Sequence, residues 1–388
     1  MRADRAWVKR NLGFDPIVTP APAATFAFKA AVPRDSTPED LQREIIDFDS
    51  EASEGKEFFA FTTATGLSRF TDIPWPAGLA PKTGPKPSGD GSGPLPKADV
   101  LVVTWTVDEG HALSRVLTPG VDSHNDYVSY THNFAAISSK MRKGCPALEA
   151  KRLGAFWTTS IGGKKVVVFK SDSHLSQDIK KLPANGGTLP NFDVWKQIIE
   201  EVQPKLVITT GTAGGIGTQC EVGDVIVSPI VRMDGIQWLK SASFHDEIFQ
   251  DQAAPKTKFF TKAKALFKAN AEQLPKDNTR PPKIVVSKRA AASVVTTDFF
   301  GFDTSDNHYG LKGLGDVSEM GDAILGLVMS QIDAPPRWLA VRNVSDPQIK
   351  AVGKLKDQAS LAAQIYKGFG RWSTICSAIV CWALIAAE

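Results

Sequence analysis

The stretch Gly211-Thr212-Ala213-Gly214-Gly215-Ile216-Gly217 follows the apolar run Leu206–Thr210 and precedes a second apolar run, Val225–Ser228. Its spacing does not fit the Gly-x-Gly-x-x-Gly fingerprint, and no Gly-Lys-Ser/Thr sequence makes it a phosphate-binding P-loop. We therefore predict a strand, a glycine-rich turn and another strand. Glycines at such a turn permit positive φ and bring a ligand close to the backbone. The alternative is a tight turn that only packs.

Similar apolar runs recur after residue 97 and alternate with segments of helical spacing. The expected strands are Val100–Val103, Lys165–Phe169, Leu206–Thr210, Val225–Ser228, Ala292–Thr296 and Trp338–Arg342. The expected helices are Phe192–Gln203, Met320–Gln331 and Ser360–Ala387. Continuous apolar runs are typical of strands covered on both faces. The alternation of strands and helices predicts an α/β sandwich.

The first quarter of the chain has a different character. Seven prolines lie between residues 74 and 97 among many glycines and serines, and little periodicity precedes them apart from a short expected helix near Pro38–Phe48. We interpret residues 1–96 as an N-terminal extension with a Pro/Gly-rich linker, and residues 97–388 as the main domain.

Composition excludes several function classes. The net charge is only +3 and no long Lys/Arg run is present, so nucleic-acid binding is not expected. Four scattered cysteines without a Cys-x-x-Cys pair fit a reducing compartment, and we expect a cytoplasmic protein with no signal peptide. The apolar tail Ser373–Ala387 is shorter than the ~20 residues that span a bilayer, so we expect a buried helix rather than a membrane anchor.

A carboxyl group follows the last expected strand, in Val344-Ser345-Asp346. An acid at the end of an apolar strand can face a leaving group, and burial would raise its pKa enough to keep a proton near neutral pH. A carboxyl that merely opens a turn before Pro347 is the alternative.

The chain resembles the superfamily of purine nucleoside phosphorylases and methylthioadenosine/S-adenosylhomocysteine nucleosidases. The resemblance covers about residues 98 to 388. Five pieces occur in the family's order, namely Val100–Leu113, Gly211–Ser228, Thr297–Phe300, Ser318–Met320 and Arg342–Asp346. It implies a three-layer α/β/α sandwich with a central mixed, partly barrel-like sheet. It also implies a nucleoside substrate, no metal or organic cofactor, and a homo-oligomer of two or more subunits.

The resemblance also implies catalytic roles. Asp346 would protonate or hydrogen-bond the leaving purine, and Glu109 would hold and activate water, with its neighbour Asp108 as the alternative. Arg342 would border the site of the nucleophile. The substrate-binding residues implied in the same way are Thr212, Ala213, Gly214, Phe300 (or Phe299 if the register slips), Glu319, Met320 and Asp322.

Two departures from the family pattern leave alternatives open. Gly321 stands where the family usually has a carboxylate that grips the ribose, so Asp322 replaces it or the sugar is held differently. The phosphorolytic branch of the family usually has an arginine just before the glycine-rich stretch, and the run Lys205–Thr210 has none. Together with Glu109, this departure favours water over phosphate as the nucleophile. We therefore expect a nucleosidase acting on a purine nucleoside or a 5′-modified relative. A phosphate-dependent phosphorylase and a non-catalytic binding protein are the alternatives. His174, in an unusual segment after the second strand, is a further candidate for ligand contact.

Overall fold

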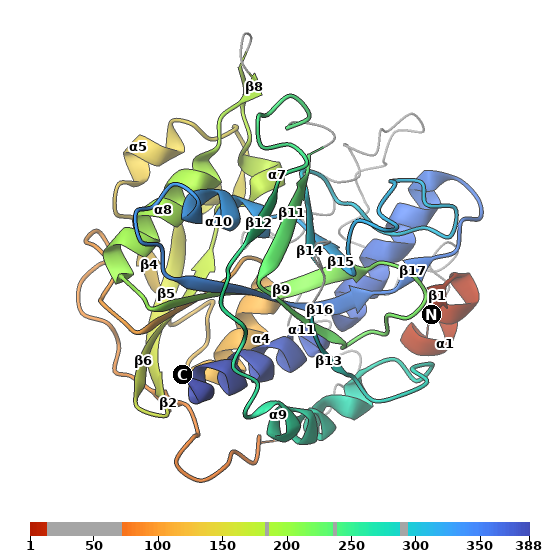
Figure 1. Cartoon of the computed structure of the whole chain (residues 1–388), viewed down its shortest axis with the longest axis horizontal. Coiled ribbons are helices and arrows are strands. Elements are labelled where there is room, and N and C mark those ends of the chain that lie inside the picture. Colours follow the sequence, from red (N-terminus) through yellow and green to blue (C-terminus); the bar gives the residue numbers. More distant parts are fainter. Residues whose placement is uncertain (14–71, 183–185, 236–238, 288–293) are drawn as a thin grey trace.

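The computed structural model describes residues 1–13, 72–182, 186–235, 239–287 and 294–388. Within these ranges a sheet of 13 strands carries helices on both faces (Figure 1). The three-layer α/β/α architecture with a central mixed sheet, predicted from the sequence, is confirmed. The expected helix near Pro38–Phe48 lies outside the described residues.

The sheet branches at strand β9 (Leu206–Gly215). Along its first half β9 pairs in parallel with β3 (Val100–Thr104), and at its end it pairs antiparallel with β15 (Val317–Glu319). Along almost its whole length it also pairs in parallel with β16 (Arg337–Asp346). The ends of β9, β15 and β16 therefore meet in one region of the molecule.

The remaining strands extend the sheet from this centre. From β3 the order continues through β6, β5 and β2, with β4 paired to β5; from β15 it continues through β14, β11 and β12, and β16 leads to β10 and β13. Their bounds are β2 Lys82–Thr83, β4 Val128–Tyr130, β5 Gly154–Ile161, β6 Lys164–Ser171, β10 Val225–Ser228, β11 Ile230–Asp234, β12 Ile248–Gln250, β13 Ile284–Val286 and β14 Val294–Thr297. A separate short hairpin joins β7 Lys181–Leu182 to β8 Gly186–Gly187.

Helices cover the two faces of the sheet. On one face α4 (Val107–Leu117) and α11 (Leu355–Ala387) pack together against β9 and β16. Elsewhere α8 (Pro190–Val202) and α10 (Asp322–Met329) pack on each other, and α10 contacts β11 and β14. The shorter helices are α5 Phe134–Ser138, α6 Pro146–Ala150, α7 Leu175–Asp178, α9 Phe260–Leu266 and the 3₁₀ helix η1 Phe267–Gln273.

Helix α11 is the apolar tail of the sequence and belongs to the core. By length and composition it could cross a membrane, but 89% of its most apolar window is buried inside the fold, which is typical of a core helix. Two of its serines have a partner there, because the amide of Asn343 lies 2.7 Å from the hydroxyl oxygens of both Ser373 and Ser377. The four cysteines are buried and unpaired.

Parts of the predicted N-terminal extension contact the main domain. Strand β1 (Arg2–Ala3) pairs with β17 (Gln348–Ile349), which follows β16 directly, and Trp7 of α1 (Arg5–Leu12) packs edge-on against Phe369 of α11. Strand β2 joins the edge of the main sheet through β5. The division of the chain at residue 96 stays a prediction.

The glycine-rich stretch differs from its prediction. Strand β9 does not stop at Thr210 but runs through Gly215, so most of the expected turn is strand and the chain turns only between Ile216 and Asp224. Hydrogen bonds with β16 continue along this part of β9, because β16 is itself long enough to pair with it.

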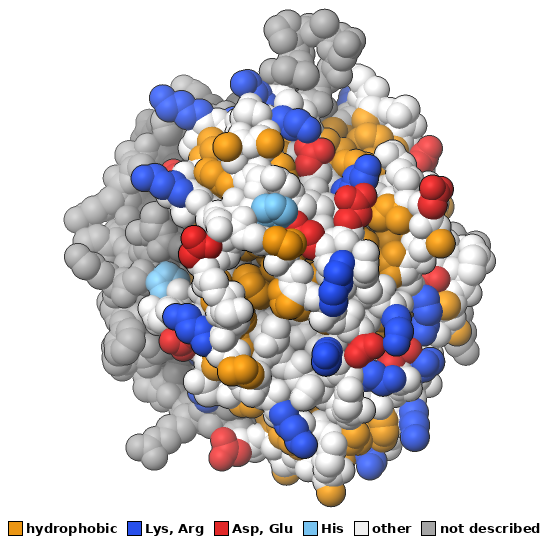
Figure 2. All heavy atoms as spheres, turned by 90° about the vertical axis from the view of Figure 1, so that its left-hand side faces the viewer, with side chains coloured by type: hydrophobic (Ala, Val, Ile, Leu, Met, Phe, Trp, Pro, Cys, Tyr) orange, Lys and Arg blue, Asp and Glu red, His pale blue; other side chains and the backbone are white. Residues whose placement is uncertain are grey.

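On the face shown in Figure 2, Lys/Arg and Asp/Glu side chains are interspersed. Such a surface fits the small net charge of +3.

Candidate active site

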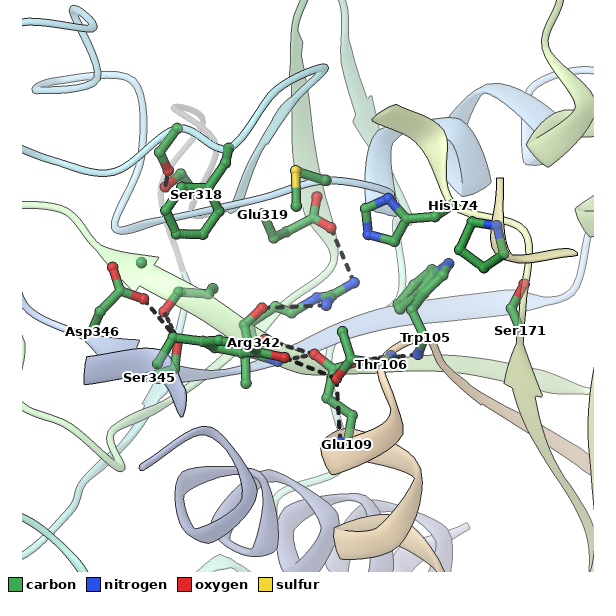
Figure 3. Close-up of a pocket in the computed structure, with 18 of the residues that line it drawn as sticks. Trp105, Thr106, Glu109, Ser171, His174, Ser318, Glu319, Arg342, Ser345 and Asp346 are labelled. Atoms are coloured by element: carbon green, nitrogen blue, oxygen red, sulfur yellow. Dashed lines mark hydrogen bonds and ion pairs between the residues drawn. The ribbon is translucent and has the colours of Figure 1, made fainter. Parts of the chain in front are cut away.

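One cavity gathers nine of the ten site residues predicted from the sequence (Figure 3). Its walls come from the ends of β3, β6, β9, β15 and β16 and from the start of α4. The predicted residues that line it are Glu109, Thr212, Ala213, Gly214, Phe300, Glu319, Met320, Arg342 and Asp346. The segments near residues 109, 212 and 346, which are far apart in the sequence, therefore meet in one hollow.

Asp346 lies at one end of the cavity, where β16 has a bulge. The pairing of β16 with β9 shifts between Val344 and Asp346, so that Asp346 pairs with Gly214. Neighbouring residues of a regular strand point to opposite faces, whereas a bulge can re-aim a side chain, and here both Ser345 and Asp346 line the cavity. The Ser345 hydroxyl donates to Asp346 Oδ1 at 2.8 Å. Burial nevertheless raises the pKa of Asp346 to about 7.

Glu109 lies below the middle of the cavity, in the first turn of α4. It forms a capping box with Thr106, so its carboxylate returns to the backbone that enters the helix. Oε1 accepts from Thr212 N at 2.6 Å and Thr212 Oγ1 at 2.7 Å. Oε2 accepts from Thr104 Oγ1, Trp105 N and Thr106 N at 3.0, 3.1 and 2.9 Å.

These contacts keep Glu109 ionised. Burial alone would raise the pKa of this carboxyl, but the Arg342 charge and the donors from Thr212 and Thr106 outweigh it and hold the pKa below its usual value. The adjacent Asp108 is not among the residues that line the cavity. The geometry therefore favours Glu109 of the two acids.

The glycines of β9 make room for these two carboxyl groups. A Cβ at Gly211, where φ is +155°, would lie 2.4 Å from Glu109 Oε1, and a Cβ at Gly214 would lie 3.0 Å from Asp346 Oδ2. The sequence predicts that these glycines admit a ligand to the backbone. At these two positions the close approach comes from the protein's own acids, and Gly214 in addition lines the cavity.

Arg342 is buried at the centre of a charged cluster. Its Nε donates to Asp322 Oδ2 at 2.8 Å, its Nη2 donates to Asp322 Oδ1, and Nη2 lies 3.1 Å from Glu319 Oε2. Asp322 is the predicted residue that does not line the cavity, because its carboxylate is turned onto Arg342 and is wholly buried. It can act on a ligand only through Arg342.

Glu319 lines the cavity, and the protein's own donors bind both of its carboxyl oxygens. Its Oε1 accepts from the Thr296 hydroxyl and from Asp322 N, and its Oε2 from Asp322 N and Arg342. Burial, followed by the nearby charge of Asp322, raises the pKa of Glu319 to about 8 although Arg342 opposes the shift.

Two apolar side chains complete the predicted set. Phe300 and Met320 both line the cavity, whereas Phe299 is buried against Tyr309, with ring centroids 5.0 Å apart. Of the two phenylalanines, Phe300 is therefore the one available to stack on a ligand ring.

Sequence reasoning missed several lining residues. They include Tyr366, Lys170 and Asp172, and also Trp105, which lies within the family-like piece Val100–Leu113 but was not singled out. His174, raised as a candidate from its unusual segment, does line the cavity, and burial lowers its pKa to about 4, so it is neutral at physiological pH. The remaining lining residues are Thr106, Pro146, Ser171, Gly301, Ser318 and Ser345.

The sequence is similar to known nucleosidases. A 5′-methylthioadenosine/S-adenosylhomocysteine nucleosidase of Listeria innocua is 26% identical over 210 residues, which are 53% of this chain and 80% of the relative. One with the same name from Chromohalobacter salexigens is 38% identical over 77 residues, 20% of this chain and 27% of the relative.

Solved structures of similar proteins superpose on this chain with TM-scores below 0.5. The 5′-methylthioadenosine/S-adenosylhomocysteine nucleosidase of Neisseria meningitidis, in complex with methylthio-immucillin-A, has a TM-score of 0.44 at 15% identity and covers 75% of this chain and 100% of its own. Futalosine hydrolase of Helicobacter pylori has a TM-score of 0.42 at 13% identity, over 73% of this chain and 96% of its own.

The family model described as the phosphorylase superfamily matches residues 131–367, more than half of the chain. The match includes the glycine-rich strand end, Glu319, Arg342 and Asp346, and its start leaves Glu109 outside. Nucleosidase relatives and this match together support an N-glycosidic hydrolase. The chain belongs to the phosphorylase superfamily.

Proposed function

We propose that this protein hydrolyses the N-glycosidic bond of a purine nucleoside or a 5′-modified purine nucleoside. The observation that carries the proposal is the position of two unlike carboxyl groups on one cavity, a protonatable Asp346 and an ionised Glu109. Two acids whose pKa values are driven apart by their surroundings are suited to opposite roles in one reaction. The names of the curated relatives point to 5′-methylthioadenosine and S-adenosylhomocysteine as the first substrates to test.

Asp346 would serve the leaving group. Cleavage of the bond between the anomeric carbon and the purine nitrogen leaves negative charge on the base and positive charge on the sugar. With a pKa of about 7, Asp346 holds a proton that it can give to the ring nitrogen as the bond breaks. Phe300 would stack on the base at the same end of the cavity.

Glu109 would serve the nucleophile through Thr212. The Thr212 hydroxyl already donates to Glu109 Oε1, so its oxygen can accept a proton from a water molecule while its own proton passes to the carboxylate. The water oxygen then bonds to the anomeric carbon as the base departs. The positive charge that develops on the sugar makes the attacking water more acidic, so a carboxylate of lowered pKa is sufficient as the base.

The charges of the cavity favour water over phosphate. Its two cationic side chains each have a carboxylate partner, Arg342 with Asp322 and Lys170 with Asp172. His174 is neutral because its pKa is about 4. A phosphate ion would have to compete with these internal carboxylates for each positive charge.

The proposal is tested by base release from adenosine, inosine and 5′-methylthioadenosine, followed by chromatography with and without phosphate. We expect free purine and free sugar in both conditions. Strict dependence on phosphate, with a sugar 1-phosphate as product, would replace the nucleosidase by a phosphorylase. Thermal stabilisation by these nucleosides without base release would indicate a binding protein.

A further inference from the structure

The carboxylates around the middle of the cavity are fully engaged by the protein. An ionised carboxylate offers about four lone-pair positions. Glu109 accepts from Thr104, Trp105, Thr106 and twice from Thr212, which fills them. Any further hydroxyl donor would have to displace one of these bonds.

Glu319 and Asp322 are also engaged by the protein. Each oxygen of Glu319 has two donor atoms within 3.2 Å. Asp322 is wholly buried, and each of its oxygens accepts one hydrogen bond from Arg342. The raised pKa of Glu319 makes it a still poorer acceptor. Asp172, another acid on the cavity wall, is paired with Lys170 at Oδ1 and with Arg152 at Oδ2. Glu109, Glu319 and Asp172 therefore all have protein partners without any sugar hydroxyl.

The indole of Trp105 packs directly against Gly321. A Cβ at Gly321 would lie 3.1 Å from Trp105 Cζ2 and 3.4 Å from Cε2, so a longer side chain at position 321 would have to displace the ring. Trp105 is also held from the side by Arg342, whose guanidinium carbon is 4.6 Å from the ring centroid. Figure 3 shows the indole between Arg342 and Ser171, beside His174.

Trp105 also brings an unused donor. Only 6% of the residue is exposed, and its Nε1 has no hydrogen-bond partner among the described residues. The nitrogen itself is wholly buried, so it does not offer a hydrogen bond to a ligand in this arrangement. Trp105 therefore presents apolar ring atoms to the cavity, whereas a carboxylate would offer acceptors for hydroxyl groups.

From these contacts we infer that the enzyme does not select for the hydroxyls of the sugar. Because the ring of Trp105 packs on Gly321 and no carboxylate stands there, the enzyme accepts 2′- and 3′-deoxynucleosides as well as ribonucleosides. The inference rests on the proposed function. A buried site built to pair a substrate hydroxyl rejects an analogue without it by about 10⁴-fold or more. Here a lost hydroxyl leaves no buried carboxylate unpaired, so the expected preference in kcat/KM for the ribo form is within about tenfold.

The experiment compares matched substrates with the full-length protein. Base release is measured from adenosine, 2′-deoxyadenosine and 3′-deoxyadenosine, and from 5′-methylthioadenosine and its 2′-deoxy analogue. A preference for the ribo form within about tenfold in both series supports the inference, and a larger preference overturns it while leaving the nucleosidase intact. Absence of base release from every compound contradicts the proposed function itself.

Two variants test the cause. Trp105→Phe keeps an aromatic ring beside Arg342 and Gly321, so we expect it to change kcat/KM by no more than about tenfold, and equally for hydroxylated and deoxy substrates. The double variant Trp105→Ala/Gly321→Glu clears the ring and adds a carboxylate, and it should raise the ribo preference at least tenfold over that of Trp105→Ala alone. An unchanged preference in the double variant would assign selectivity to other residues.

Discussion

At the scale of single residues, Asp346 carries the sharpest prediction. Asp346→Asn keeps the size of the side chain and the neighbouring Ser345 but cannot deliver a proton to the base, so kcat should fall by about 10²–10⁴-fold. KM should change little, because the amide still fills the same place. The measurement is steady-state base release, with near-normal kcat in the variant as the contradicting result.

The same residue sets the expected pH dependence. The pKa of Asp346 is raised to about 7 by burial, so the proton needed by the leaving base is present below pH 7 and is lost as the pH rises. Glu109, whose pKa is lowered, stays ionised throughout this range. We expect kcat/KM to fall about tenfold per pH unit on the alkaline side, and the Asp346→Asn variant to lack this limb. An alkaline limb retained in that variant would assign the titration to another group.

At the scale of elements, the glycines of β9 pack directly against Glu109 and Asp346. Gly211→Ala would place a methyl group 2.4 Å from Glu109 Oε1 at a φ of +155°, so the carboxylate must move away from Thr212. We expect at least a 100-fold loss of kcat with the far-UV circular dichroism spectrum retained. Gly93→Ala, where an added Cβ meets nothing within 4 Å, is the matched control and should be neutral.

The strands differ in how well the sequence alone predicts them. The apolar runs at β3, β6, β9, β10, β14 and β16 were predictable because these strands are covered on both faces. Strand β5, with its polar Thr and Ser residues, and β15, only three residues long, carry no such run. The bulge in β16 also has no sequence signal, since it results from the pairing with β9.

The same distinction applies to the cavity. Asp346, Arg342 and Glu319 were found because they belong to short local patterns. Trp105 and Tyr366 reach the cavity from a strand-to-helix corner and from α11, so only the folded chain reveals them. The engagement of Asp322 by Arg342 is likewise a tertiary contact, separated by 20 positions in the sequence.

At the scale of the whole molecule, the segment at residues 1–13 is part of the structure around the site. Strand β1 pairs with β17, next to Asp346, and Lys350 N donates to Ala3 O at 2.9 Å. The side chain of Gln348 lies between Arg2, 2.9 Å away, and Asp303, in the loop that carries Phe300. The N-terminal segment therefore supports the loops beside Asp346 and Phe300. Assembly into a homo-oligomer and a cytoplasmic location stay predictions.

Trp7 is the main anchor of this segment, and its removal tests that support. The side chain is 2% exposed and packs against Phe369 of the core helix α11, with ring centroids 5.9 Å apart. Trp7→Ala should lower the free energy of unfolding by about 3–5 kcal/mol if α1 unfolds together with the core. Urea denaturation measures this, and Val352→Ala, at a position 55% exposed, is the control. A normal midpoint with a raised KM would instead show that α1 detaches locally, because only the loops beside Asp346 would then lose their support.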